Sequence, residues 1–288
     1  MSSSASRPRK LGIAAGGGPL PLAVADAARA AGRDVFIVGV RGAAGPDIAR
    51  YPHGWVRVGA MGRFLKLFKQ AGCEDIVIIG PMNRPRLADI VPDFRGLLLL
   101  PRFIRRLKTG DDALLRGVVE FLEENGLKVV GVETFLPQLL AREGLLTIRA
   151  PSASQEKDID IAIAAARDLG ARDAGQGAVA RKGEIIALED VRGTDVMLAQ
   201  LAAVRAPGDL ERDGVLVKLP KPEQERRVDR PTIGIRTVEN AAAAGLAGIA
   251  VEADGAIVND ADDVVRRANE LGLFVLGFPH SRTIGPKS

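Results

Sequence analysis

The chain has almost none of the side chains that hold soft metals or form disulfides. Cys73 is the only cysteine, and His53 and His280 are the only histidines. An internal disulfide is therefore excluded, and a zinc or iron site of the usual His/Cys type cannot be assembled. The same scarcity argues against a Cys–His pair for covalent acyl transfer. It also argues against the histidine-rich site of a two-metal phosphoesterase. Any metal must sit on oxygen ligands, which indicates Mg²⁺, with Mn²⁺ as the alternative.

Aromatic residues and long apolar runs are also scarce. Aromatics make up 4% of the chain, so stacking platforms for single-stranded nucleic acid are few. The 40 basic and 36 acidic residues are scattered, which favours an anionic small molecule or a lipid head group over nucleic acid. No run reaches the roughly 20 apolar residues of a membrane span. The basic and apolar start at 7–15 imitates a signal peptide, but glycines and prolines interrupt it, so we expect a cytoplasmic protein.

The hydrophobic pattern indicates two α/β domains. With 288 residues, 47% of them hydrophobic, the chain can bury two cores of ordinary size. In the first half, short apolar segments alternate with amphipathic ones, which predicts a parallel sheet with helices on its faces. The expected strands are 10–15, 34–40, 75–80 and 128–132, and the expected helices are 20–31, 64–71 and 111–125. We therefore predict a Rossmann-like parallel-sheet domain over residues 10–150.

The second half has a mixed pattern of hairpins and helices. A linker is expected at 150–154, and two hairpins are predicted, 177–181 with 184–188 and 248–252 with 256–258. Helices are expected at 155–169, 195–204 and 261–271, and further strands at 215–219 and 273–277. Together these elements predict a C-terminal α/β domain with a mixed sheet over residues 151–280.

The stretch 217–234 places charges and prolines between two apolar segments that are typical of buried strands, 215–217 and 233–235. A buried strand does not tolerate Lys218, Lys221 and Asp229 unless their charges are paired or hold a ligand. Two lysines and a carboxylate at the mouth of a sheet suit a polyanion together with a metal or a water molecule. This stretch is the most informative part of the chain.

Gly16, Gly17 and Gly18 lie between an expected strand and an expected helix. Their backbone N–H groups could meet a phosphate at the positive end of the helix, or the glycines could serve a tight turn that needs positive φ. A nucleotide cofactor is disfavoured, because the spacing is neither G-x-G-x-x-G nor that of a P-loop. The second strand also ends without the acidic residue that would hold a ribose.

Polar residues follow the third strand and open the next helix. Asn83 and Arg84 come after strand 75–80, where the crevice of a switch point would admit a ligand, although a solvated loop explains them as well. Asp111 and Asp112 open a helix, where carboxylates serve as caps and dipole partners. Adjacent aspartates can also bind magnesium, so both interpretations stay open.

Two glycine-containing motifs mark the second domain. The Gly-Gln-Gly sequence at 175–177 puts Gln176 and Gly177 at the start of a strand, where close approach of the backbone to a ligand competes with a β-bulge. Thr194 is a candidate helix N-cap, and Asp195 follows it.

A short apolar run at 97–104 is interrupted by proline and flanked by arginines. Ordinary burial explains it, but an apolar wall with a basic rim would also suit acyl chains and an anionic membrane surface.

Taken in order, these motifs resemble one family. The set comprises the glycines at 16–18, Asn-Arg-Pro at 83–85, Gly-Asp-Asp at 110–112, Gly-Gln-Gly-Ala-Val at 175–179, Gly-Thr-Asp at 193–195, and the stretch 218–234. Over about residues 10–277 the chain resembles the histidine-poor, two-domain UDP-2,3-diacylglucosamine pyrophosphatase of the lipid A pathway. It departs from that pattern at Arg192, where the family motif Glu-Gly-Thr-Asp begins with glutamate.

The resemblance implies hydrolysis of UDP-2,3-diacylglucosamine to UMP and 2,3-diacylglucosamine 1-phosphate, with Mg²⁺, in the cytoplasm and peripherally at the inner leaflet of the membrane. The family's essential aspartate falls on Asp229. Lys218 and Lys221 would supply positive charge to the phosphates, and Asp229 with Asp195 would hold the metal or orient water. Substrate contacts are implied for the remaining polar residues and glycines of these motifs: Gly16, Gly17, Gly18, Asn83, Arg84, Asp111, Asp112, Gln176, Gly177, Thr194, Gln224 and Thr232.

Two other functions stay open at this point. A non-catalytic sensor or carrier would bind a sugar nucleotide or a lipid phosphate with the same two domains, and turnover by purified protein separates it from an enzyme. An NADP-dependent reductase would place the 2′-phosphate on Arg41 beside the glycines at 16–18, and a nicotinamide titration tests it. The sequence leaves acyl-chain preference and homodimer formation open.

Overall fold

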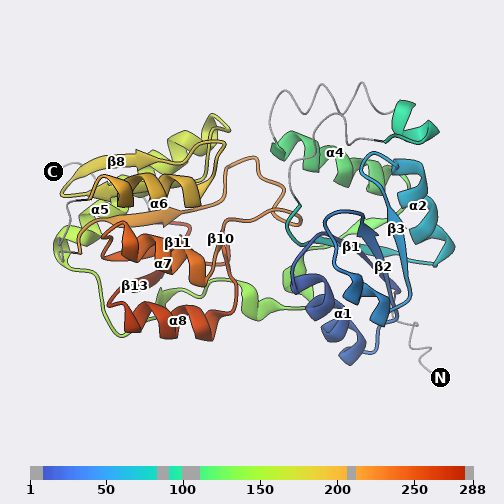
Figure 1. Ribbon diagram of the computed structural model, residues 1–288, viewed down its shortest axis with the longest axis horizontal. Helices are drawn as coiled ribbons and strands as arrows, with labels where there is room; N and C mark the ends of the chain where they lie inside the picture. The colour runs from blue at the N-terminus through green and yellow to red at the C-terminus, as the bar shows by residue number, and fades with distance from the viewer. Residues whose placement is uncertain (1–8, 83–90, 99–110, 206–211, 283–288) are drawn as a thin grey trace. The chain divides into compact units, whose positions relative to one another are not determined.

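The computed structural model of the protein describes residues 9–82, 91–98, 111–205 and 212–282, which form two compact units (Figure 1). The first unit comprises the chain up to Pro137 together with Arg227–Asp229. The second comprises Gln138–Arg226 and the chain from Arg230 onward. Each unit has its own sheet and its own hydrophobic core. The predicted two-domain α/β class is confirmed.

The first unit is built on a five-stranded parallel sheet in the order β3-β2-β1-β4-β5. Its strands are β1 Leu11–Ala15, β2 Val35–Val40, β3 His53–Val56, β4 Asp75–Ile79 and β5 Lys128–Val129. The predicted parallel sheet is confirmed. The sequence pattern does not predict β3, because this edge strand is mostly half-buried and lacks an apolar run. The strand order reverses between β1 and β4, which is where an open α/β sheet offers a ligand crevice.

Three helices pack on the first sheet. They are α1 Leu20–Ala30, α2 Met61–Gln70 and α4 Asp111–Glu124. One face of the sheet contributes Ala14, Val38 and Ile76 to a core that also contains Phe68 of α2 and Leu122 of α4. Helix α1 packs on β1 and β2 through its own buried stripe, Val24, Ala25 and Ala28. This packing leaves the strand ends and their loops as the places where polar groups can gather.

The second unit is built on a six-stranded mixed sheet in the order β6-β13-β11-β9-β7-β8. Its strands are β6 Gly144–Leu145, β7 Gly177–Arg181, β8 Glu184–Leu188, β9 Val215–Lys218, β11 Gly248–Glu252 and β13 Phe274–Phe278. Strands β9, β11 and β13 are parallel, whereas β7 runs antiparallel to β9 and β6 runs antiparallel to β13. The predicted mixed sheet and the predicted β7–β8 hairpin are confirmed.

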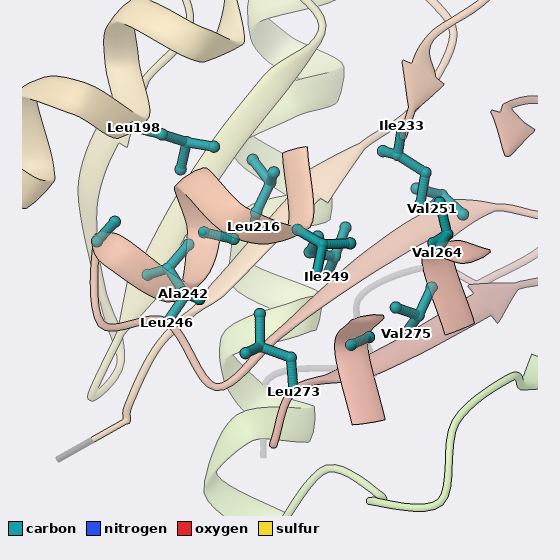
Figure 2. Close-up of a cluster of buried hydrophobic side chains, with 14 of the residues drawn as sticks. Leu198, Leu216, Ile233, Ala242, Leu246, Ile249, Val251, Val264, Leu273 and Val275 are labelled. Atoms are coloured by element: carbon teal, nitrogen blue, oxygen red, sulfur yellow. The ribbon is translucent and has the colours of Figure 1, made fainter. Parts of the chain in front are cut away.

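Helices cover both faces of the second sheet. They are α5 Ala153–Ala171, α6 Thr194–Ala203, α7 Ile235–Ala243 and α8 Ala261–Glu270. Because side chains alternate along a strand, Leu216 of β9 faces the core formed with α6, α7 and α8 (Figure 2), whereas Val215 and Val217 face α5. The same alternation places Lys218, the last residue of β9, on the same face of the sheet as Leu216.

Two predictions about this unit are wrong. Residues 248–252 and 256–258 do not form a hairpin, because β11 pairs in parallel with β9 and β13, and β12 Ile257–Val258 pairs in parallel with β10 Thr232–Ile233. Tertiary pairing overrides the turn signal of Asp254-Gly255 here. The strand expected at 233–235 ends at Ile233, since Ile235 already begins α7, whose buried residues Val238, Ala241 and Ala242 follow a helical spacing.

The division of the chain between the units lies at Pro137/Gln138, 13 residues before the boundary proposed from the sequence at 150/151. Residues 138–150 group with the second unit because β6 pairs with β13 and because the Ala141 N–H donates to the Ala256 carbonyl over 2.9 Å. The composition change near 150 marks the start of α5 instead. There Ser152 accepts from the Gln155 N–H, and the Gln155 side chain accepts from the Ser152 N–H, which forms a capping box.

Candidate active site

The carboxyl ends of the parallel strands in the second unit carry a group of buried polar residues. Strand β9 ends at Lys218, which lies beside Gly177 of β7 and Val251 of β11 in the sheet. Among the described residues, the buried polar side chains that end a strand of this sheet or lie in the chain that follows one include Lys218, Glu252, Gln224, Glu189 and Thr194. Because ligands of α/β sheets bind outside the carboxyl ends of the strands, this edge is the candidate site of the second unit.

Lys218 is the most buried cation of this edge, with 6% of its surface exposed. Its ammonium group donates to the Thr232 carbonyl over 3.2 Å, which connects β9 to β10. A buried ammonium group is costly without such partners. The structure therefore gives the Lys218 ammonium group at least this hydrogen-bond partner, and its proposed role toward a ligand stays a prediction.

A tight turn after β9 brings together three of the residues singled out in the sequence. The Lys221 N–H donates to the Gln224 side-chain oxygen over 3.0 Å, and Gln224 in turn donates to the Gln176 side-chain oxygen over 3.2 Å. The backbone carbonyl of Gln176 also accepts from the Leu219 N–H. The Lys221 ammonium forms a 2.7 Å ion pair with Asp173, so part of its charge is already balanced.

Glu189, which sequence reasoning missed, lies at the centre of the other half of this edge. Its buried carboxylate accepts from the Thr194 hydroxyl over 2.8 Å, and its N–H donates to the Gly177 carbonyl. A Cβ on Gly177 would lie 2.5 Å from Glu189 Oε2, and a Cβ on Gly175 would lie 2.5 Å from the Glu189 carbonyl oxygen. The glycines at 175 and 177 therefore have a reason within the fold, which is the close approach of Glu189. The available signal was a carboxylate directly after a strand.

Asp195, expected as a metal ligand, has structural partners for both of its carboxylate oxygens. Arg236 forms a 2.7 Å ion pair with one oxygen, and the Asn240 amide donates to the other over 3.0 Å. Because Arg236 and Asn240 belong to α7, these contacts join the first turn of α6 to α7. This arrangement supports a structural role for Asp195.

In the first unit, the glycines at 16–18 contact the end of β4. The N–H groups of Gly16 and Gly17 donate to the carbonyls of Ile79 and Pro81 over 2.9 and 2.8 Å, so they are occupied by the protein rather than open to a phosphate. A Cβ on Gly16 would lie 2.3 Å from the Gly80 carbonyl oxygen. The backbones of the two loops thus approach each other at the reversal point of the strand order. Gly18, with φ +76, leads into α1.

The neighbouring predicted residues are described only in part. Asn83 and Arg84 lie outside the described residues. Helix α4 begins at Asp111, whose side chain is likewise outside the description, and Asp112 is buried with 3% of its surface exposed. A carboxylate buried in the first turn of a helix fits the cap interpretation of this pair.

Asp229 belongs to the first unit, although the chain on either side of Arg227–Asp229 belongs to the second. Arg227 donates to the Glu123 carboxylate over 2.6 Å and to the Val129 carbonyl over 3.2 Å, and Val228 packs against the core of the first unit. The segment is therefore bound to α4 and to the end of β5. Asp229 thus belongs to the first unit, whereas Lys218 belongs to the second.

Comparison with known proteins places this architecture in a family. Residues 10–139 match the LpxI N-terminal domain, and residues 142–276 match the LpxI C-terminal domain. A protein of Caulobacter vibrioides, named UDP-2,3-diacylglucosamine pyrophosphatase LpxI, is 42% identical over 273 residues, which are 93% of this chain and 97% of that protein. The chain belongs to the LpxI family.

The LpxI domain matches agree with the structure on where the chain divides. The two matches meet between residues 139 and 142, next to the division at Pro137/Gln138. Glu189 accepts from the Thr194 hydroxyl, whereas Arg192, the residue before Gly193, forms an exposed ion pair with Asp190. The roles proposed for individual residues stay predictions.

Cysteine chemistry gains no support from the structure of this LpxI-family chain. Cys73 is buried in the core of the first unit, and burial raises the pKa of its thiol to about 11. The thiol is therefore protonated at neutral pH and is not a nucleophile.

Proposed function

We propose that this chain hydrolyses the pyrophosphate bond of UDP-2,3-diacylglucosamine, giving UMP and 2,3-diacylglucosamine 1-phosphate in the cytoplasm. The observation that carries the proposal is the match, over nearly the full length of both chains, to a pyrophosphatase of that name at 42% identity. The structure supports it, because a buried lysine and a set of polar side chains lie at the carboxyl ends of the parallel strands of the second sheet, where ligands of α/β sheets bind.

The chemistry requires a water oxygen to bond to one phosphorus while the bridging P–O bond breaks and its electron pair stays with the other phosphate. Negative charge spreads over the phosphoryl oxygens on the way, so positioned cations lower the barrier. Lys218 is the group that we assign to this charge, with Lys221 beside it. Asp229 orients the attacking water or holds a metal ion.

Incubation of purified protein with UDP-2,3-diacylglucosamine tests the proposal directly. We expect UMP and the sugar 1-phosphate to appear in equal amounts, as measured by mass spectrometry. Saturable binding of the substrate without product would support the alternative, a non-catalytic protein that binds a sugar nucleotide or lipid phosphate. Hydrolysis of UDP-glucose at the same rate would show that the diacylated sugar is not recognised.

We expect hydrolysis to require a divalent hard cation, Mg²⁺ or Mn²⁺. In the described residues, no three or more His, Cys, Asp or Glu side chains lie close enough together to hold a metal ion, which fits an ion held by one or two carboxylates and by the substrate phosphates. The ion supplies charge neutralisation at the phosphates when it is bound. Chelation should reduce the rate of UMP release by at least about 100-fold, because several kcal/mol of charge stabilisation are lost. Added Mg²⁺ should restore the rate.

Two outcomes would contradict the metal assignment. Full activity after exhaustive chelation would mean that lysines alone neutralise the phosphates. Restoration by Zn²⁺ but not by Mg²⁺ would point to softer ligands than the oxygen atoms proposed here.

We also propose peripheral contact with the inner leaflet, where a diacylated substrate resides. Within the described ranges, no helix has the length and apolar character to cross a membrane. Residues 91–98 expose several large apolar side chains, Val91, Phe94, Leu97 and Leu98, in the stretch where the sequence also has an apolar and arginine-rich run. Such side chains can insert into the interface of an anionic bilayer.

Sedimentation with anionic phospholipid vesicles tests this contact. Replacing Phe94 and Leu98 by serine should weaken vesicle binding by about 100-fold or more, since each large apolar side chain contributes about 1.5 kcal/mol or more when it is buried and each 1.4 kcal/mol is about tenfold in affinity. A matched variant replaces Val191 and Val204, which are equally exposed but lie in the second unit, and should bind like the wild type. Equal binding by both variants would remove residues 91–98 from the membrane contact.

A further inference from the structure

The chain passes from one unit to the other at three points. Near each of these points, residues of the second unit contact one turn, Glu252–Ile257, which joins β11 to β12. The chain passes at 137/138, at 226/227 and at 229/230. After the first passage, Ala141 accepts from the Asp254 N–H and donates to the Ala256 carbonyl, both over 2.9 Å. These contacts and those described below lie within the second unit.

The same turn holds both ends of the segment that carries Asp229. On one side, Arg226 Nη1 lies 3.5 Å from Glu252 Oε1. On the other side, Arg230 donates to the Asp254 carbonyl over 2.7 Å, and the Ile257 N–H donates to the Pro231 carbonyl over 2.8 Å. Residues 227–229 thus form a short excursion into the first unit whose two ends are fixed to one turn of the second.

Glu252 is an unusual residue to find at this position. It ends strand β11 and has only 2% of its surface exposed, and its Oε1 atom receives no hydrogen bond from the described residues. Burial of a carboxylate is unfavourable without cationic partners. The cationic partner of Glu252 is Arg226, and the His280 ring also lies beside the carboxylate, with Nδ1 3.1 Å from Oε2. An apolar residue at position 252 would stabilise the fold about as well as a buried ion pair, so stability alone does not explain the carboxylate.

The turn is also shaped around this carboxylate. A Cβ on Gly255 would lie 2.5 Å from Glu252 Oε1, and Asp254 adopts a left-handed conformation with φ +55. The local backbone therefore keeps Oε1 close to the turn, where it faces Arg226.

We propose that Glu252 and Arg226 are positioning residues for hydrolysis, because their ion pair fixes the segment that carries Asp229. The inference rests on the proposed function, in which Asp229 acts on the phosphate diester. A catalytic carboxylate must be held within a fraction of an ångström of its working position. Loss of the ion pair leaves Asp229 chemically intact but lets the segment 227–229 move.

The test uses Arg226→Met and Glu252→Gln in the full chain. We expect kcat to fall by about tenfold or more, because a misplacement of about 1 Å can reduce a rate 100-fold, while KM changes little. The double variant should lose no more than the more impaired single variant, because both act through one contact. Arg267→Met is the matched control, since Arg267 also pairs with a glutamate and its side chain is 35% exposed, against 39% for Arg226.

Hydrogen exchange of the amides at 226–230 provides a readout that is independent of activity. We expect exchange there to rise about threefold or more in Arg226→Met and not in Arg267→Met. Unchanged exchange would contradict the proposal that the ion pair fixes the segment 227–229. Raised exchange with kcat within twofold of the wild type would overturn the positioning role. If the wild type itself does not hydrolyse the substrate, the proposed function fails, and exchange still decides whether the turn anchors the segment.

Discussion

Asp229→Ala is expected to abolish hydrolysis of UDP-2,3-diacylglucosamine, with kcat reduced by at least about 100-fold, the usual loss when a general base or metal position is removed. Substrate affinity should be largely preserved, because the lysines of the second unit, if they bind the diphosphate as proposed, are unchanged in this variant. Interactions that act only in the transition state lower kcat and leave binding intact when they are removed. The variant should therefore retain substrate, detectable as bound lipid by mass spectrometry.

Two further variants sharpen the interpretation of Asp229. Asp229→Asn keeps the shape of the side chain and removes its charge, so it should be nearly as inactive as the alanine variant. Asp168→Ala removes an exposed aspartate that pairs with Arg172 on the surface of α5, and it should behave like the wild type. If Asp229→Ala kept more than about a tenth of kcat, the carboxylate role would pass to another residue, and Asp111 would be the next to test.

Lys218→Met is expected to reduce kcat/KM by about 100-fold or more, the scale of removing one preorganised charge or donor at a reacting oxygen. The stability of the protein should not fall with it. Methionine fills much of the space of the lysine stem, and replacing a buried charge by an apolar side chain is often neutral or stabilising. Kinetics and thermal unfolding of the same preparation measure both effects.

The comparison of activity with stability decides what Lys218 does. If Lys218 served only to bond the Thr232 carbonyl, the variant would melt at a lower temperature and keep its kcat/KM, contrary to our expectation. Lys157→Met is the matched control, because Lys157 is an exposed lysine on α5 of the same unit. It should change neither quantity.

Regular segments of this chain were predictable because their side chains repeat with a clear period. The parallel sheet follows from short apolar segments such as Ile76–Ile79, and the β7–β8 hairpin follows from the Lys182-Gly183 turn, where both residues adopt positive φ. Predictions were weakest where a strand is two residues long. Pairing of β10 with β12 depends on neighbours brought from elsewhere in the chain, and no local period reports it.

The candidate site was likewise predictable from the sequence only in part. The lysines and the carboxylate at 218–229 predict a site for a phosphate-containing ligand, because charges between buried strands need a partner or a ligand. The sequence does not show that Glu189 bonds to Thr194, that Asp195 is held by α7, or that the Gly16 and Gly17 amides are occupied by β4. Each of these contacts joins segments whose proximity results from packing.

Fold class, an anionic ligand and the identity of the charged segment could thus be inferred from the order of the residues, since they depend on composition, period and spacing along the chain. The reaction and its substrate were implied only by the resemblance to a known family. Only the tertiary structure decided to which unit each of these residues belongs. Asp229 is bound to the first unit through Arg227 and Val228, and the turn at Glu252 fixes the chain on either side of it. Contacts between residues far apart in sequence arise only when sheets and cores have formed, so local pattern carries no record of them.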